Sequence, residues 1–337
     1  MRRRVVALSG LALALPFFAA FGDPVNQIVA FGDSLTDTGN ASIATLGAQP
    51  GAGYAYRTIP GLPFQVGEFT NPPEAGGPSG LWIDQFAAKA GLPDPQPFLA
   101  PGSGTNFAVA GADTGSNGIG YVSDQVGIYV GGKSSVPSTS LYSFWAGAND
   151  IIGGNNPVTA ADNLEANIAT LAGEGGKYFL WFNVPLLGDT PRGQASGDAL
   201  ALNAASLAFD TEWAHDIQSL DHSHPGIVVV GVNVEALFSS ILSDPGRYGL
   251  NPGSTPPGGN ANDYLFSFDG LHPTSEGDLL IADLAYSDFE AAIQPASGGT
   301  VPEPASAGLA ILGLCGCLAA RLRRNSRRVG LEAKDRG

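Results

Sequence analysis

The sequence predicts an α/β fold arranged as a three-layer α/β/α sandwich. Short apolar runs alternate along the chain with longer segments in which apolar residues recur every three or four positions. Strands that are separated by helix-length segments usually form a parallel sheet with right-handed crossovers, which places helices on both faces. With 337 residues, of which 44% are apolar, the chain is long enough to bury a core of this kind.

The expected elements follow from local patterns. Apolar runs predict strands at 28–31, 105–110, 141–146, 178–184 and 227–232. Helical spacing of apolar residues predicts helices at 81–90, 160–172, 198–220 and 275–293. The first of these helices is followed by Gly91 and Pro93, which are typical of a helix end. Two Gly- and Pro-rich tracts without periodicity, 48–80 and 252–262, are expected to be loops, the second a surface loop or lid edge.

Charge is distributed unevenly. Ten of the 16 basic residues lie within residues 1–22 and 301–337, which leaves six between positions 23 and 300 against 28 of the 31 acidic residues. The central part therefore carries a formal charge of about −22, which would repel phosphate backbones and argues against nucleic-acid binding. Both cysteines, Cys315 and Cys317, lie in a C-terminal apolar run, so residues 23–300 have no disulfide framework and no thiolate metal site.

Residues 1–22 have the pattern of a signal peptide. An arginine cluster precedes an apolar core from Val5 to Ala20, and the small residues that follow suit a signal-peptidase site. Pro16 and the shortness of the apolar run favour a cleaved leader over a membrane span. We therefore expect the protein to be exported.

Residues 301–337 combine three features: Val301-Pro-Glu-Pro304, an apolar segment from Ala305 to Ala320, and an arginine-rich end. The 16 apolar residues would cover about 24 Å as a helix, which is short for a bilayer unless flanking arginines extend it. The arrangement resembles the PEP-CTERM sorting signal, which implies processing by an exosortase-type enzyme. The expected location is the cell envelope, cell surface or medium, with a C-terminal membrane anchor until processing. A plain membrane tail is the alternative.

Ser34 is the first candidate for chemistry. The strand expected at 28–31 ends in Gly32-Asp33-Ser34, so the serine lies at the carboxyl end of a strand, where open α/β sheets bind ligands. A serine there is well placed to attack a substrate. An Asp/Ser cap on a following helix explains the same tripeptide equally well.

Three more segments have suitable residues at expected strand or helix ends: Gly111, Asn149, and the pair Asp269 and His272. A serine hydroxyl needs an imidazole to accept its proton, and that imidazole works best when a carboxylate holds its other nitrogen. Gly111 can bring a backbone N–H close to a reacting carbonyl, and the Asn149 amide and the Ser34 N–H could add two more donors. Together these groups would suffice for acyl transfer.

The order and content of four segments resemble the successive blocks of the GDSL lipases, a branch of the SGNH hydrolases: Gly32-Asp-Ser-Leu35, Asn106-Phe-Ala-Val-Ala-Gly111, Gly147-Ala-Asn-Asp150 and Asp269-Gly-Leu-His-Pro273. The resemblance covers residues 26–290. It implies a hydrolase domain at 23–300, a flavodoxin-like sheet of five parallel strands, and activity on acyl esters, lipid or other, without cofactor or metal.

The same resemblance implies roles residue by residue. Ser34 matches the nucleophile, His272 the base and Asp269 the partner of the base. The oxyanion donors match Ser34, Gly111 and Asn149. Tract 71–80 is similar to an insertion that could reshape the acyl pocket.

Several other side chains support less specific functional interpretations. Five residues near the end of one expected helix could suggest a metal site: His215, Asp216, Asp221, His222 and His224. Their spacing matches no zinc-binding motif. Asp33, Asp37 and Asp150 are expected to orient their loops by hydrogen bonds. Trp82, Trp145 and Trp181 are expected in the core. Four aromatic residues could line an acyl pocket or lid, or simply pack within their loop: Tyr54, Tyr56, Phe64 and Phe69.

The resulting expectation is an exported serine esterase or lipase. Within the same fold, a polysaccharide O-deacetylase or an acyltransferase is the alternative. A surface or matrix protein that uses the fold only for binding is the alternative from another class, because a fold alone does not determine function.

Overall fold

The computed structural model describes residues 25–102, 104–118 and 120–294, and these residues form the predicted α/β/α layers. The central sheet has four parallel strands in the order β1 (Gln27–Gly32), β4 (Ser140–Trp145), β5 (Tyr178–Phe182) and β6 (Val228–Val232). Because the strands run in the same direction, their carboxyl ends share one edge of the sheet. That edge is where α/β folds of this kind bind ligands.

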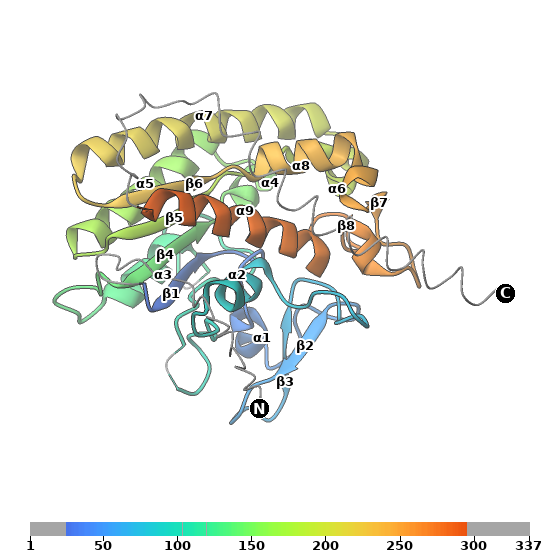
Figure 1. The fold of residues 1–337 in the computed structure, drawn as a ribbon, viewed down its shortest axis with the longest axis horizontal. Coiled ribbons are helices and arrows are strands. Elements are labelled where there is room, and N and C mark those ends of the chain that lie inside the picture. Colours follow the sequence, from blue (N-terminus) through green and yellow to red (C-terminus); the bar gives the residue numbers. More distant parts are fainter. Residues whose placement is uncertain (1–24, 103, 119, 295–337) are drawn as a thin grey trace, which may run out of the picture.

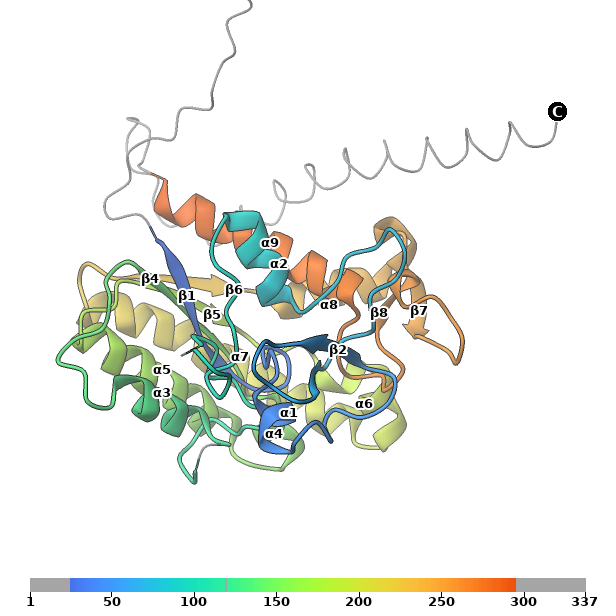
Figure 2. The ribbon, with the colours of Figure 1, turned by 90° about the horizontal axis from the view of Figure 1, so that it is seen from below.

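Six helices cover the two faces of the sheet (Figures 1 and 2). One face packs against α3 (Val122–Val130), α5 (Pro157–Gly173) and α7 (Ala199–Ser223), and the other against α2 (Trp82–Ala90), α8 (Val234–Ser243) and α9 (Ser275–Ile293). Alternate residues of β1 serve the two cores, since Val29 and Phe31 join the first and Ile28 and Ala30 the second. A strand buried on both faces explains the continuous apolar run in the sequence.

The remaining elements are short and flank the sheet. They comprise α1 (Asn40–Ala44), α4 (Ala148–Ile152), α6 (Pro191–Ser196), 3-10 helices at Leu187–Asp189, Pro245–Tyr248 and Ala261–Asp263, and strands β2 (Ala55–Thr58), β3 (Gln65–Glu68), β7 (Asn251–Ser254) and β8 (Tyr264–Phe266). Several of these short elements carry the loops that surround the candidate site.

The strand predicted at 105–110 is wrong as a regular strand, so the described sheet has four strands where five were expected. The segment does lie beside β1, where Ala30 N donates to Thr105 O at 3.0 Å and Phe107 N to Ala30 O at 2.7 Å. The Asn106 side chain interrupts it, because its Oδ1 accepts the N–H of Ala108 at 3.0 Å. A local bond of this kind bends the backbone away from a continuous ladder.

Tract 48–80 is not loop throughout, because β2 and β3 form an antiparallel hairpin within it, next to α1 (Figure 1). Tract 252–262 is also partly regular, since β7 pairs with β8. Both strand pairs are short, and this explains why neither produced a sustained sequence pattern.

The expected signal peptide and the PEP-CTERM-like tail lie outside the described residues. Within residues 25–294, as far as these are described, no helix is long and apolar enough to cross a bilayer.

Candidate active site

The turn after β1 presents Ser34 at the carboxyl edge of the sheet. Gly32 has a φ of +154°, and a Cβ at this position would lie 2.3 Å from the carbonyl oxygen of Trp145, so a side chain does not fit. The Gln125 side chain of α3 holds the turn, accepting the Gly32 N–H and donating to the Gly32 carbonyl, both at 2.9 Å. Asp33 is buried, whereas Ser34 remains partly exposed and lines a cavity.

Asp269 and His272 lie on the loop between β8 and α9. Asp269 Oδ1 accepts the N–H groups of Leu271 and His272 at 3.0 and 3.1 Å, so the aspartate folds its own loop. Its Oδ2 lies 2.5 Å from His272 Nδ1, and His272 Nε2 lies 2.8 Å from Ser34 Oγ. The structure thus brings Ser34, His272 and Asp269 into one line of hydrogen bonds, although Ser34 and His272 are 238 residues apart in the chain.

The electrostatics of this line favour an ionised aspartate. Burial alone would raise the pKa of Asp269, but hydrogen bonds and charge attraction from His272, together with a hydrogen bond from Tyr54, lower this pKa below its ordinary value. A carboxylate that stays charged near neutral pH keeps the Nδ1–H tautomer of His272 in place. The free Nε2 then faces Ser34.

The other two candidate oxyanion donors, Gly111 and Asn149, belong to two other segments of the chain. Ala110 N donates to Asp37 Oδ2 at 2.8 Å, which ties the segment containing Gly111 to the loop after β1. Within the described residues, neither the Ser34 N–H nor the Gly111 N–H donates a hydrogen bond. Asn149, in the first turn of α4, lines the same cavity as Ser34 and His272, whereas Gly111 does not line it.

The Asn149 amide has partners of its own. Its Nδ2 lies 3.2 Å from Asp33 Oδ2 and 3.1 Å from the Ala112 carbonyl oxygen. Two hydrogens therefore already have acceptors. Asn149 can donate to a substrate oxyanion only if one of these bonds lengthens or is shared.

Three buried carboxylates beside the site hold loops, as predicted. Asp37 accepts the N–H groups of Gly39, Asn40, Ala41 and Ala110. Asp150 accepts from the N–H and hydroxyl of Thr114, both at 3.0 Å. Burial raises the pKa of Asp33 to about 7 and that of Asp150 to about 6.

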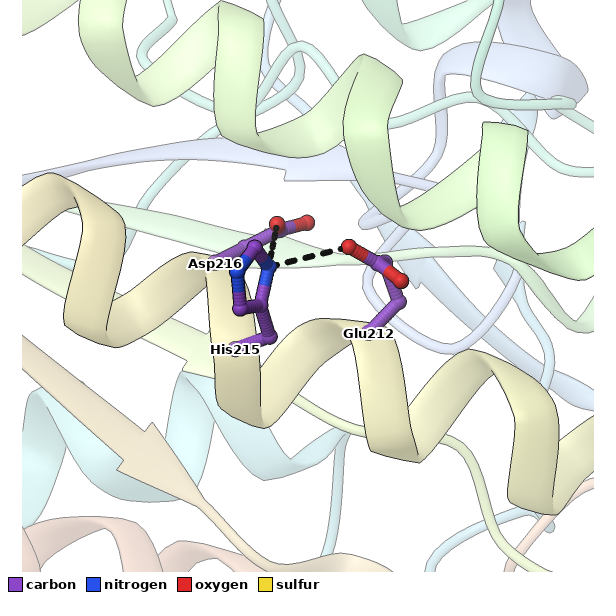
Figure 3. Close-up of side chains that lie close together, drawn as sticks. All are labelled: Glu212, His215 and Asp216. Carbon is purple, nitrogen blue, oxygen red and sulfur yellow. Dashed lines mark hydrogen bonds and ion pairs between the residues drawn. The ribbon is translucent and has the colours of Figure 1, made fainter.

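The possible metal group on α7 is only partly assembled. Glu212, His215 and Asp216 lie together, with His215 Nδ1 at 3.0 Å from Glu212 and 3.3 Å from Asp216 (Figure 3). Both carboxylates face the same ring nitrogen, Nδ1, and its bonds to Asp216 and Glu212 raise the pKa of His215 (Figure 3). The two hydrogen bonds of His215 Nδ1 hold the three side chains together, while Asp221, His222 and His224 are not part of the cluster.

The aromatic residues of tract 48–80 divide into two pairs. Tyr56 donates to the Gly51 carbonyl, and Phe64 packs against the small cluster of Ile59 and Val66. Tyr54 and Phe69 instead surround the candidate base, which the sequence pattern had not indicated. The Tyr54 hydroxyl donates to Asp269 Oδ2 at 2.7 Å, and the Phe69 ring centroid lies 5.0 Å from that of His272.

Trp82, Trp145 and Trp181 are buried in the core, as predicted. Trp145 also lines the cavity at Ser34, together with apolar side chains of the neighbouring loops. The core of the sheet therefore forms the floor of the candidate site.

Comparison with known proteins adds independent information. The family model described as GDSL-like Lipase/Acylhydrolase matches residues 28–285. An uncharacterized protein from the trpE-trpG intergenic region of Pseudomonas putida is 27% identical over 326 residues, covering 84% of this chain and 52% of that protein. A thermolabile hemolysin of Vibrio parahaemolyticus is 26% identical over 243 residues, covering 69% of this chain and 51% of that protein. The chain thus spans about half the length of these two relatives.

A GDSL esterase/lipase of Arabidopsis thaliana is 23% identical over 362 residues, covering 85% of this chain and 95% of that protein. Among solved structures, a carbohydrate acetylesterase from Sinorhizobium meliloti is 13% identical, with a TM-score of 0.42 and coverage of 79% of this chain and 99% of that one.

Proposed function

Because the chain belongs to the GDSL-like lipase/acylhydrolase family over residues 28–285, we propose that it hydrolyses carboxylic esters with Ser34 as the nucleophile. His272 is the proposed general base and Asp269 its partner. The observation that carries this proposal is the continuous contact from Ser34 Oγ to His272 Nε2 at 2.8 Å and from His272 Nδ1 to Asp269 Oδ2 at 2.5 Å. A binding protein would not need this arrangement.

The proposed reaction is a double displacement. His272 Nε2 takes the Ser34 proton as Oγ attacks the ester carbonyl, and the resulting imidazolium then protonates the leaving alcohol. Water attacks the acyl-enzyme by the same route, with His272 again as the base, and the carboxylic acid leaves. Asp269 stays ionised throughout and stabilises the imidazolium.

Negative charge on the carbonyl oxygen needs donors that are in position before the reaction. The proposed donors are the Ser34 N–H, the Gly111 N–H and the Asn149 side-chain amide. The first two have no competing acceptor among the described residues, whereas Asn149 must share a hydrogen with Asp33 or the Ala112 carbonyl. Preorganised donors of this kind each contribute about 3 kcal/mol to transition-state stabilisation.

The cavity at Ser34 favours a short acyl group. Its volume is about 30 Å³, the space of roughly two water molecules, and its lining includes Trp145, Phe238 and Leu187. An acetyl group matches this size, but a long acyl chain would require the surrounding side chains to move. This observation supports a second candidate within the same chemistry, removal of O-acetyl groups from a polysaccharide. Acyl transfer to another alcohol would use the same acyl-enzyme.

We also propose that the enzyme acts outside the cytoplasm, in the cell envelope or medium. Support comes from sequence alone, namely the leader-like residues 1–22 and the PEP-CTERM-like residues 301–337. The exosortase-type enzyme is the proposed partner for processing of the tail.

Hydrolysis of p-nitrophenyl esters from acetate to palmitate tests the proposal, with the purified protein beside its Ser34→Ala and Ser116→Ala variants. Ser116 is a matched control because its hydroxyl donates to Asp124 and it does not line the cavity at Ser34. We expect activity that is highest on acetate or butyrate, lost in Ser34→Ala and kept in Ser116→Ala. Activity that survives Ser34→Ala would contradict the assignment of Ser34 as the nucleophile. A folded protein that cleaves neither these esters nor acetylated polysaccharide would favour a binding role.

A further inference from the structure

The β2–β3 hairpin carries two aromatic rings to the candidate base. Ala55 pairs with Glu68 in the hairpin, and the Ala55 N–H donates to the Thr70 carbonyl at 2.8 Å, so the ladder continues past the end of the strands. Tyr54 and Phe69 are therefore neighbours across the ladder, with ring centroids 5.4 Å apart. Phe69 lies against the His272 ring, and the Tyr54 hydroxyl donates to Asp269.

The Tyr54 hydroxyl contacts the same carboxylate oxygen that His272 uses. Asp269 Oδ2 accepts from Tyr54 Oη at 2.7 Å and lies 2.5 Å from His272 Nδ1. The other oxygen, Oδ1, is occupied by the Ser267 hydroxyl and by the N–H groups of Leu271 and His272. The backbone and Ser267 bonds fix the position of the carboxylate, so the loop does not need Tyr54 to hold Asp269.

We propose that Tyr54 is a positioning residue, whose hydroxyl group shares Asp269 Oδ2 with His272 and limits how strongly the carboxylate retains a proton on the imidazole. This inference rests on the proposed function of Ser34 and His272 and adds a residue to it. A carboxylate oxygen that accepts two strong hydrogen bonds gives less electron density to each. The imidazolium then loses its proton more easily, and the neutral imidazole that results can act as a base.

The charges around the Asp269–His272 pair determine the direction of the effect expected for Tyr54→Phe. The titratable and charged groups that face the Asp269–His272 pair are Tyr54 from the hairpin, Arg192 from α6 and Asp33 from the turn after β1. Tyr54→Phe removes one hydrogen bond from Asp269 and leaves Arg192 and Asp33 in place. Asp269 then becomes a better acceptor for the imidazolium N–H, so the variant should hold a proton on His272 more strongly than the wild-type protein does.

An NMR titration tests this without requiring that any ester be cleaved. The Cε1–H signal of His272 is assigned by its disappearance in His272→Gln, since the chain has four histidines. The control is Tyr56→Phe, which removes a hydroxyl from the same hairpin but one that is bonded only to Gly51. We expect the titration midpoint of His272 to rise by roughly half to one pH unit in Tyr54→Phe and to stay unchanged in Tyr56→Phe.

The pH dependence of kcat/KM on p-nitrophenyl acetate should change in the same way. The acid limb should move to higher pH in Tyr54→Phe, which lowers the rate about three- to tenfold below the midpoint and little above it. A loss that is equal at all pH values, a midpoint that does not move, or a shift of the same size in Tyr56→Phe overturns the inference. If no ester is hydrolysed but the NMR midpoint moves, the role of Tyr54 stands and the proposed function fails.

Discussion

At the residue scale, the proposed chemistry depends on a weak nucleophile that is activated by its neighbours. A serine hydroxyl is not ionised at neutral pH, so Ser34 depends on His272 Nε2 at 2.8 Å to take its proton during attack. Asp269 in turn has a lowered pKa and remains charged wherever His272 is neutral. The proposed proton transfer, from Ser34 Oγ to His272 Nε2, therefore uses contacts that exist before a substrate binds.

Replacing Asn149 by alanine should lower kcat by about 10²- to 10³-fold with little change in KM, because an oxyanion donor acts mainly on the transition state. Steady-state kinetics on p-nitrophenyl acetate measure both constants. The control is Asn155→Ala, which removes an exposed amide that follows the same helix and donates to Asp113 Oδ2 at 3.5 Å. A kcat for Asn149→Ala within a few-fold of the wild-type value would remove Asn149 from the oxyanion hole.

Sequence patterns and the resemblance to the GDSL lipases singled out Ser34, Asp269 and His272 as candidates, and each stands beside a local signal, a strand end or the start of a helix. They did not identify the contact of Tyr54 with Asp269, because the two residues are 215 positions apart and Tyr54 lies in a Gly- and Pro-rich tract. They also gave no sign that Asp33 and the Ala112 carbonyl already hold the Asn149 amide. Side-chain bonds of this kind depend on how the loops fold over one another.

At the element scale, the four expected helices and the four strands of the central sheet were predictable, whereas several elements with weaker sequence patterns were not. The helix expected at 275–293 has those bounds, since Thr274 caps it by accepting the Gly277 N–H at 3.1 Å and apolar residues recur along its length. Helices α3 and α8 were missed, at nine and ten residues, and so was the β2–β3 hairpin. The hairpin depends on contacts with distant residues, which no local pattern contains.

Arg57 is the main polar anchor of that hairpin. Its guanidinium lies 3.0 Å from Glu68, 3.2 Å from Asp94 and 3.7 Å from Asp84 of α2, and it also donates to the Thr38 carbonyl. Glu68 is buried, so removal of the cation leaves an unpaired carboxylate in the interior. The ion pairs therefore connect the hairpin to the sheet through α2.

We expect Arg57→Gln to lower the free energy of unfolding by about 3 kcal/mol at pH 8, as for other buried ion pairs that lose one partner. Urea denaturation measures the free energy of unfolding, and the control is Arg247→Gln, which replaces an exposed arginine. The cost should be smaller at pH 5, because burial raises the pKa of Glu68 to about 7 and the carboxyl group is then neutral. An equal cost at both pH values would mean that packing, and not charge, explains the effect.

At the scale of the whole molecule, burial of acidic groups should set the pH dependence of stability. Burial raises the pKa of Asp33 and Asp210 to about 7, and that of Asp150, Asp216 and Asp288 to about 6. Unfolded aspartate has a pKa of about 4, so between pH 4 and 7 the folded state binds more protons than the unfolded state. Stability from these groups is present below pH 4 and is lost as pH rises through 6 and 7.

The melting temperature should therefore be higher at pH 5 than at pH 8, by at least about 2–4 °C, which corresponds to about 1 kcal/mol in a domain of roughly this size. Differential scanning calorimetry at constant ionic strength measures the melting temperature at each pH. The high acidic charge between residues 23 and 300 acts in the same direction, and added salt should reduce only that part of the difference. A melting temperature that rises from pH 5 to pH 8 would contradict the effect of the buried carboxyl groups.

The most direct test of the central claim, that Ser34 is a nucleophile activated by His272, is covalent labelling with diethyl p-nitrophenyl phosphate followed by mass spectrometry. Attack of Ser34 Oγ on phosphorus expels p-nitrophenolate and leaves a diethylphosphoryl group on the serine, so the test requires no knowledge of the natural ester. We predict one such group per chain, on the peptide containing Ser34, with no label in Ser34→Ala and greatly slowed labelling in His272→Gln. A folded protein that takes up no label, or takes it up on another residue, would contradict the claim.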